Sequence, residues 1–144
     1  MKAAVYLGGQ KFEVKEVPTP EPGPGELLVK TRYASICGTD VHGVLYDVVP
    51  PGSIMGHEYS GTVAAVGQGV SKWRLGDRVA GAYGGAPPPG SPNRFVENPR
   101  YNFRTVGWTT LPSGFSGYAE YILMDDWMPS SVPDGVSDLS LIHI

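Results

Sequence analysis

Residues 18–33 read Pro18-Thr19-Pro20-Glu21-Pro22-Gly23-Pro24-Gly25-Glu26-Leu27-Leu28-Val29-Lys30-Thr31-Arg32-Tyr33, and this stretch determines the fold class that the sequence predicts. Proline has no amide hydrogen to donate, so residues 18–25 cannot take part in a regular ladder of strands. Residues 26–33 are rich in apolar side chains and are typical of a strand. A strand that starts where a Pro/Gly segment ends indicates short strands separated by turns, and therefore a mainly β fold.

The same pattern continues on both sides of this stretch. Short apolar runs alternate with turn residues such as Gly8-Gly9 and Gly67-Gln68-Gly69. The expected strands cover residues 2–7, 12–17, 26–33, 59–66, 77–80 and 118–124. Residues 37–46 predict a short helix instead, with Thr39 or Asp40 as its N-cap.

The composition predicts a folded domain. The chain has 144 residues, of which 20 are glycine and 14 are proline, and this content approaches that of disordered chains. However, 41% of the residues are apolar, only 17% are charged and the formal net charge is −3, so a core is available. The length fits one domain, which would bury roughly two-thirds of the surface of its unfolded chain.

Composition also limits the cellular location and the binding partners that we expect. A single cysteine, Cys37, cannot form an intrachain disulfide, and the first residues lack the charged-then-apolar pattern of a leader, so we expect a cytoplasmic protein. No stretch reaches the roughly 20 apolar residues of a membrane span. With 11 Lys+Arg against 14 Asp+Glu and no basic cluster, nucleic acid and anionic membranes are not expected partners. A small molecule or a protein therefore remains as the expected partner.

Residues 81–117 break the strand pattern. They contain Pro87-Pro88-Pro89-Gly90-Ser91-Pro92 and a mixture of Arg, aromatic and polar residues without periodicity. The segment is too long for an ordinary connection between strands, so it is interpreted as a functional loop, a separate lobe or a disordered insert.

Candidate chemistry is concentrated in two segments, Cys37-Gly38-Thr39-Asp40-Val41-His42 and Gly56-His57-Glu58-Tyr59-Ser60-Gly61. A thiolate, an imidazole and a carboxylate brought together from both would form a mixed site that suits Zn²⁺ and leaves a fourth position for water or substrate. The alternative is that Cys37 is an ordinary buried thiol and His57 a core histidine.

These two segments, followed by Gly-Asp-Arg-Val at residues 76–79, resemble the zinc-dependent medium-chain alcohol dehydrogenase family. The resemblance covers residues 1–138 and includes Pro-Gly-Pro-Gly-Glu at 22–26 and Gly-Tyr-Ala-Glu-Tyr at 117–121. It implies the family's N-terminal catalytic domain, a partly open β-barrel similar to GroES, with short helices and a long loop lobe at 81–117.

The resemblance also implies a metal site. Cys37 and His57 match the catalytic zinc ligands of the family, and Glu58 matches a glutamate that in some members ligates zinc or exchanges with its water. Asp40 would accept a hydrogen bond from the far nitrogen of His57 and fix its tautomer. Members with a second, structural zinc carry four cysteines in the lobe, and this lobe has none, so we expect one zinc per chain.

The implied activity is oxidation of an alcohol or polyol by hydride transfer to NAD or NADP. Thr39 matches the hydroxyl that relays the substrate's proton, and His42 matches a histidine on the outer part of that relay. The resemblance implies a catalytic role for Glu58 as well. The resemblance leads us to expect a homo-oligomeric enzyme acting on a small molecule.

The cofactor-binding residues are expected outside this sequence. Gly67-Gln68-Gly69 is only a fragment of a phosphate-binding loop and no helical run follows it, so it is interpreted as a turn. Residues 139–144 look like a non-native tail on a truncated gene model. We therefore expect the 144-residue chain alone to show negligible turnover. Two alternatives remain: a zinc-free reductase similar to quinone oxidoreductases, and a non-catalytic β-barrel module that binds a protein.

Overall fold

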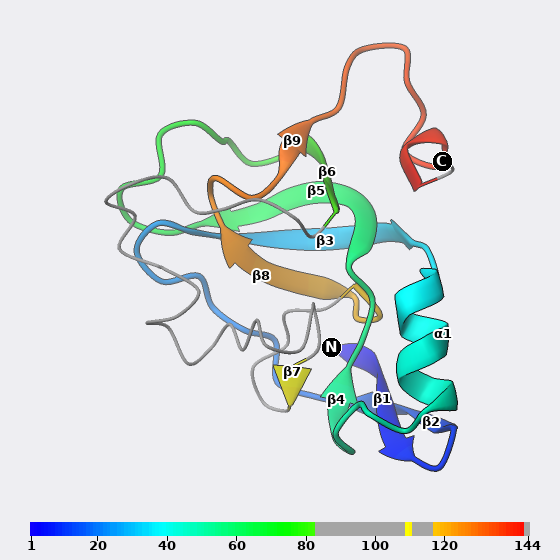
Figure 1. Cartoon of the computed structure of the whole chain (residues 1–144). Coiled ribbons are helices and arrows are strands. Elements are labelled where there is room, and N and C mark those ends of the chain that lie inside the picture. Colours follow the sequence, from blue (N-terminus) through cyan, green and yellow to red (C-terminus); the bar gives the residue numbers. More distant parts are fainter. Residues whose placement is uncertain (83–108, 111–116, 143–144) are drawn as a thin grey trace.

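The computed structural model describes residues 1–82, 109–110 and 117–142 and shows a mainly β chain, as predicted (Figure 1). The strands form two antiparallel sheets that do not close into a barrel within the described residues. The first sheet has the order β2-β1-β4-β7, with bounds Lys11–Glu16, Lys2–Gly8, Ser53–Ile54 and Thr109–Thr110. The second has the order β8-β3-β5-β6-β9, with bounds Tyr121–Asp125, Glu26–Ala34, Glu58–Val66, Arg78–Ala82 and Ser130–Ser131.

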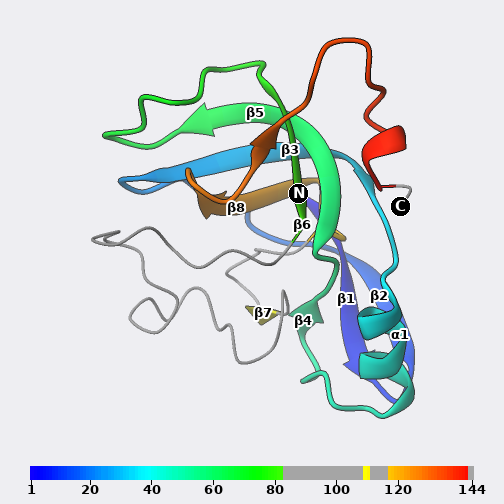
Figure 2. The same cartoon turned by 45° about the horizontal axis from the view of Figure 1, so that its top comes forward.

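Strand β3, predicted from residues 26–33, is the centre of the larger sheet. It pairs with β5 on one side and with β8 on the other, which Figure 2 shows as three long neighbouring strands. Leu27 and Val29 are completely buried. The β3–β5 contact requires Gly61, because a Cβ there would lie 2.3 Å from the Lys30 carbonyl oxygen.

The main core packs against this sheet. Its buried side chains are Leu27, Val29, Tyr59, Val63, Trp73, Val79, Ile122 and Met124. A smaller cluster lies on the first sheet and contains Ala3, Val5, Val17, Ile54 and Ala119. Burial of large aliphatic side chains stabilises such a fold by about 1.5–3 kcal/mol each.

The predicted helix is α1, Gly38–Leu45, but its cap differs from the expectation. Cys37 is the N-cap, and Asp40 lies three residues later, where its Oδ2 accepts a hydrogen bond from the Cys37 N–H at 3.0 Å. This is a capping box. Neither Thr39 nor Asp40 is the N-cap, because both already have helical positions after Cys37.

Several predicted boundaries shift. Strand β8 begins at Tyr121 rather than at residue 118, while Ala119 forms only an isolated bridge to Ala3. Strand β6 extends to Ala82 and β7 lies at Thr109–Thr110, so part of the predicted 81–117 lobe belongs to the sheets. Residues 83–108 and 111–116 of that lobe lie outside the described residues.

The end of the described chain is attached to the larger sheet. The Arg78 guanidinium donates to Asp138 Oδ1 at 2.9 and 2.7 Å, and the buried Ser60 hydroxyl donates to the Asp138 carbonyl oxygen at 2.8 Å. A short 3₁₀ helix, η2, follows at Ser140–Ile142. Within the described residues, no helix has both the length and the apolar character needed to cross a bilayer.

Candidate metal centre

The two segments singled out in the sequence meet at one end of the larger sheet. Strand β3 ends beside the start of β5, where Ala34 pairs with Tyr59, and the Ser35 N–H donates to the Glu58 carbonyl oxygen at 3.0 Å. Cys37 lies three residues after the end of β3 and is the N-cap of α1, which stands at this end of β3 in Figure 1. The sheet register therefore brings Cys37 next to residues 57 and 58.

One ligand atom each of Cys37, His57 and Glu58 lies within 4.8 Å of the others. In the described part of the chain, this is the only cluster of three or more His, Cys, Asp or Glu side chains close enough to hold a metal ion. The His57 side chain is 9% exposed, whereas Cys37 and Glu58 are half-buried. The cluster is thus held by the fold on one side and accessible on the other.

The two nitrogens of His57 face different neighbours. Nε2 lies 3.2 Å from the Thr39 hydroxyl oxygen, whereas Nδ1 lies 3.6 Å from Asp40 Oδ1. The second distance is slightly longer than an ordinary hydrogen bond, so the hydrogen bond expected between Asp40 and His57 stays a prediction. The other oxygen of Asp40 accepts a hydrogen bond from the Cys37 N–H.

The charges of the cluster influence one another. The Asp40 carboxylate, followed by Cys37, raises the pKa of His57 to about 9 although burial opposes this. Burial alone would raise the pKa of Asp40, but His57 and the Cys37 N–H outweigh it and the pKa is lowered. Hydrogen bonds with Thr39 lower the pKa of the Cys37 thiol. The site thus favours a carboxylate and a thiolate around the imidazole.

Thr39 and His42 both lie on α1 and are exposed. Residues three apart in a helix share one face, so the two side chains are neighbours on its surface. The His42 ring also lies 5.9 Å from the Tyr46 ring. Thr39 therefore contacts the metal cluster through His57, and His42 extends this face toward solvent.

Two further residues contact the site, and neither was expected from the sequence. The Ser35 hydroxyl donates to Glu58 Oε2 at 2.5 Å. The Tyr118 hydroxyl donates toward Asp40 Oδ2 at 3.1 Å and the Ser35 carbonyl oxygen at 3.2 Å. Ser35 and Tyr118 are common residue types in loops and strands, and only the strand register reveals that they reach the site.

The donor set fits zinc. A thiolate, an imidazole nitrogen and a carboxylate oxygen are the three ligand types that Zn²⁺ binds in proteins, and three protein ligands leave a position for substrate. His57 Nε2 faces the Thr39 side of the cluster and Nδ1 faces a carboxylate, which is the arrangement that metal-bound histidines commonly show.

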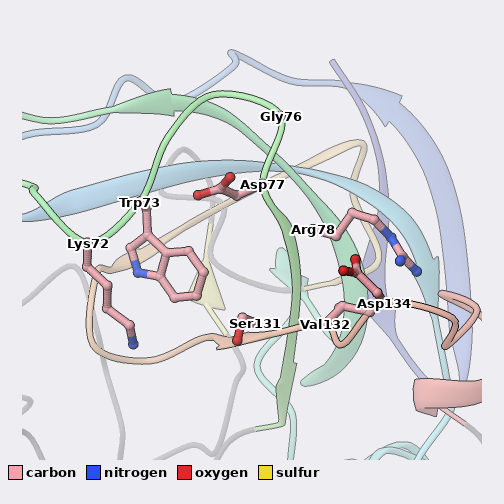
Figure 3. A pocket seen from close by; sticks show the side chains of 8 residues that line it. All are labelled: Lys72, Trp73, Gly76, Asp77, Arg78, Ser131, Val132 and Asp134. Carbon is pink, nitrogen blue, oxygen red and sulfur yellow. The ribbon is translucent and has the colours of Figure 1, made fainter.

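The described residues line two cavities near the larger sheet, among others. The bigger one, about 470 Å³, contains none of the metal-cluster residues, and in Figure 3 Lys72 and Trp73 face Ser131 and Val132 across it. The Lys72 ammonium lies 4.6 Å from the centre of the Trp73 ring. The smaller one, about 280 Å³, has Glu58 of the metal cluster among its lining residues. Its other lining residues are Tyr59, Ala80, Gly81, Ser130, Leu141 and Ile142.

The fold and the site define an antiparallel β domain that presents a thiol, an imidazole and a carboxylate for a metal ion. Residues 23–134 match the family model described as the alcohol dehydrogenase GroES-like domain. The chain therefore belongs to the alcohol dehydrogenase GroES-like domain family, and the resemblance found in the sequence is confirmed.

Curated relatives carry dehydrogenase names. An alcohol dehydrogenase of Moraxella sp. (strain TAE123) is 35% identical over 156 aligned positions, which cover 100% of this chain and 43% of the relative. An L-threonine 3-dehydrogenase of Stenotrophomonas maltophilia (strain K279a) is 43% identical over 86 residues, or 56% of this chain and 25% of the relative. The chain thus spans less than half the length of these relatives.

One solved structure is similar to this chain in both fold and sequence. The acetophenone reductase from Geotrichum candidum NBRC 4597 in complex with NAD has a TM-score of 0.70 and 32% sequence identity. The match covers 95% of this chain and 41% of the reductase. The description of the matched family and the names of these similar proteins are all names of oxidoreductases.

Proposed function

We propose that this chain is the metal-holding catalytic domain of a zinc-dependent, NAD(P)-dependent dehydrogenase that oxidises an alcohol or polyol to a carbonyl compound. The observation that carries the proposal is the convergence of Cys37, His57 and Glu58, whose ligand atoms lie within 4.8 Å of one another. The dehydrogenase names of the relatives support the reaction class.

Cys37, His57 and Glu58 would hold the zinc ion. The ion would supply Lewis-acid chemistry, because a cation beside an alcohol oxygen lowers the pKa of its hydroxyl. Asp40 keeps a negative charge beside His57 and opposes rotation of the imidazole. Ser35 holds the carboxylate of Glu58 through its hydroxyl. The protein thus contributes a preorganised set of ligands.

Thr39 and His42 would carry the proton away. A hydroxyl both accepts and donates hydrogen bonds, so Thr39 can receive the substrate's proton while it releases its own outward. His42 lies on the same face of α1 and is exposed, so it can pass the proton to solvent. NAD or NADP would supply the acceptor for the hydride of the carbinol carbon.

The residues that bind the nicotinamide cofactor are not assigned in this chain. Gly67 and Gly69 belong to a turn after β5, and no helix starts there. The NAD in the acetophenone reductase supports a nicotinamide cofactor for the proposed dehydrogenase.

Metal analysis of the purified chain tests the proposal. The chain should contain close to one zinc per molecule, and C37S combined with H57A should lose it. H42A is the matched control, because it removes an exposed imidazole outside the cluster and should retain zinc. A zinc-free wild-type chain would refute the zinc site and favour the zinc-free reductase. A metal-free chain that captures a protein would favour the binding module.

A further inference from the structure

Tyr118 is attached to the chain segments that surround the metal cluster. Its backbone N–H donates to the Met55 carbonyl oxygen at 2.9 Å, and its carbonyl oxygen accepts the Ala4 N–H at 2.8 Å. The neighbouring Gly117 N–H donates to the Gly56 carbonyl oxygen at 2.7 Å. The backbone of Tyr118 is therefore fixed against the residues that directly precede His57.

The ring of Tyr118 occupies the space that Gly56 leaves open. Gly56 has a φ of +93°, and a Cβ at this position would lie 2.5 Å from the Tyr118 ring. The turn that presents His57 therefore also fixes the ring of Tyr118. A ring placed this closely has little freedom to rotate, so the position of its hydroxyl is defined.

The hydroxyl of Tyr118 is directed at Asp40. It lies 3.1 Å from Asp40 Oδ2 and 3.2 Å from the Ser35 carbonyl oxygen. A phenol has one hydrogen to donate, and a bond to the ionised carboxylate is the stronger of the two. Asp40 Oδ2 thus has two donors, the Tyr118 hydroxyl and the Cys37 N–H, and the carboxylate is 3% exposed.

Anchoring of Oδ2 determines what Oδ1 can reach. The last torsion of an aspartate is broad and roughly two-fold, so an unanchored carboxylate turns readily. With Oδ2 held on the side of Tyr118 and Cys37, Oδ1 is directed at His57 Nδ1, 3.6 Å away. This placement leaves Nε2 on the opposite side of the ring, 3.2 Å from the Thr39 hydroxyl oxygen.

We propose that Tyr118 is a positioning residue for the metal centre, which acts through Asp40 to set the orientation of His57. The contacts run from Tyr118, in the segment before β8, to Asp40 in α1, and from Asp40 to His57, which directly precedes β5. The inference rests on the proposed function, since it concerns the same zinc site. Tyr118 itself is not one of the three candidate ligands.

Zinc and cobalt binding to the 144-residue chain test this role. Tyr118→Phe keeps the ring against Gly56 and removes only the hydroxyl. We expect zinc affinity, measured by competition with a chromophoric chelator, to fall about threefold to tenfold, which is less than the roughly 10–100-fold typical of direct outer-shell partners. The visible absorption bands of bound Co²⁺ should shift, because the imidazole is less firmly oriented.

Two controls separate this role from a structural one. Tyr6→Phe also removes a tyrosine hydroxyl that donates to a carboxylate, that of Asp47, away from the cluster. It should lower stability without changing zinc affinity or the Co²⁺ bands. In an Asp40→Asn background, Tyr118→Phe should change zinc affinity by less than about twofold, because residues acting through one partner are not additive.

The outcomes distinguish the two proposals. If the wild-type chain binds zinc and Tyr118→Phe binds it equally well with unchanged Co²⁺ bands, the role of Tyr118 is refuted and the zinc site stands. Full additivity of the two substitutions would refute the route through Asp40. If the wild-type chain binds neither zinc nor Co²⁺, the proposed function itself fails.

Discussion

Ser35 holds Glu58 at two points: its hydroxyl donates to Glu58 Oε2 at 2.5 Å, and its backbone N–H donates to the Glu58 carbonyl oxygen at 3.0 Å. The first contact fixes the carboxylate and the second fixes the start of β5. Because Ser35 is two residues before Cys37, the same turn places two of the three candidate ligands. The metal cluster is thus built into the junction between β3, α1 and β5.

Removal of the Ser35 hydroxyl should therefore affect both stability and metal binding. In Ser35→Ala, Glu58 loses a hydrogen bond to a charged oxygen, which is typically worth about 1.5–3 kcal/mol. We expect the free energy of unfolding in urea to fall by about 1.5 kcal/mol, the lower end of that range, because both side chains are half-buried. Zinc affinity should fall about tenfold.

Ser53→Ala is the matched control for this prediction. The Ser53 hydroxyl donates to the Pro50 carbonyl oxygen at 2.6 Å, outside the metal cluster. Its loss should lower stability without changing zinc affinity. Equal zinc affinities of wild type and Ser35→Ala would show that the hydroxyl does not position Glu58.

The sequence predicted the long elements because each carries its own local signal. Residues 26–33 form β3 almost as expected, since a strand-forming run follows a segment that cannot pair. The two-residue strands β4 and β9 were not predicted, because so short a segment shows no periodicity. Their positions depend on the partner strands, which local sequence does not specify.

The residues of the site likewise divide into those that the sequence predicted and those that it did not. Residues 37, 57 and 58 were predicted from motifs, and the structure brings them together. Ser35 and Tyr118 were not predicted, because their roles depend on contacts across 23 and 78 residues of sequence. Such contacts follow from sheet register and from the turn at Gly56, and neither is visible in the residue types alone.

Thr39 should be needed for turnover and not for metal binding. Its side chain is exposed, so Thr39→Val should leave stability within about 0.5 kcal/mol of wild type. In an active dehydrogenase that contains this domain, kcat should fall about 10²–10⁴-fold, the contribution typical of a proton-transfer group. Thr39→Ser keeps the hydroxyl and should retain most activity. Steady-state kinetics with parallel zinc analysis check this, and full activity of Thr39→Val would contradict the relay.

Gly56 should tolerate no side chain. In Gly56→Ala the Cβ would have an unfavourable φ of +93° and would lie 2.5 Å from the Tyr118 ring. Backbone strain and overpacking each cost about 1–3 kcal/mol, so we expect a loss of about 2–6 kcal/mol in urea unfolding. Gly52→Ala is the control, since its φ is +90° but no atom lies within 4 Å of the added Cβ. Equal losses in the two variants would mean that the Tyr118 ring yields without cost.

Asp138 should stabilise the larger sheet. Its carboxylate is 8% exposed and accepts two hydrogen bonds from Arg78, which is 35% exposed. Breaking a buried ion pair costs about 3–5 kcal/mol, and the exposure of Arg78 reduces this, so Asp138→Ala should cost about 2 kcal/mol in urea unfolding. The exposed pair of Glu13 and Lys15 is the control, and Glu13→Ala should cost less than about 0.5 kcal/mol. A similar cost for both variants would show that burial of Asp138 adds nothing.

Residues 139–144 should contribute less to the free energy of unfolding than Asp138 does. The contacts of Arg78 and Ser60 with this segment end at Asp138, while Leu139 is 44% exposed. Deletion of residues 139–144 keeps these contacts and should change the free energy of unfolding by less than about 1 kcal/mol. Zinc affinity should also stay unchanged, although Leu141 and Ile142 line the cavity that reaches Glu58. A loss as large as that of Asp138→Ala, or a changed zinc affinity, would instead mean that the tail is an integral part of the domain.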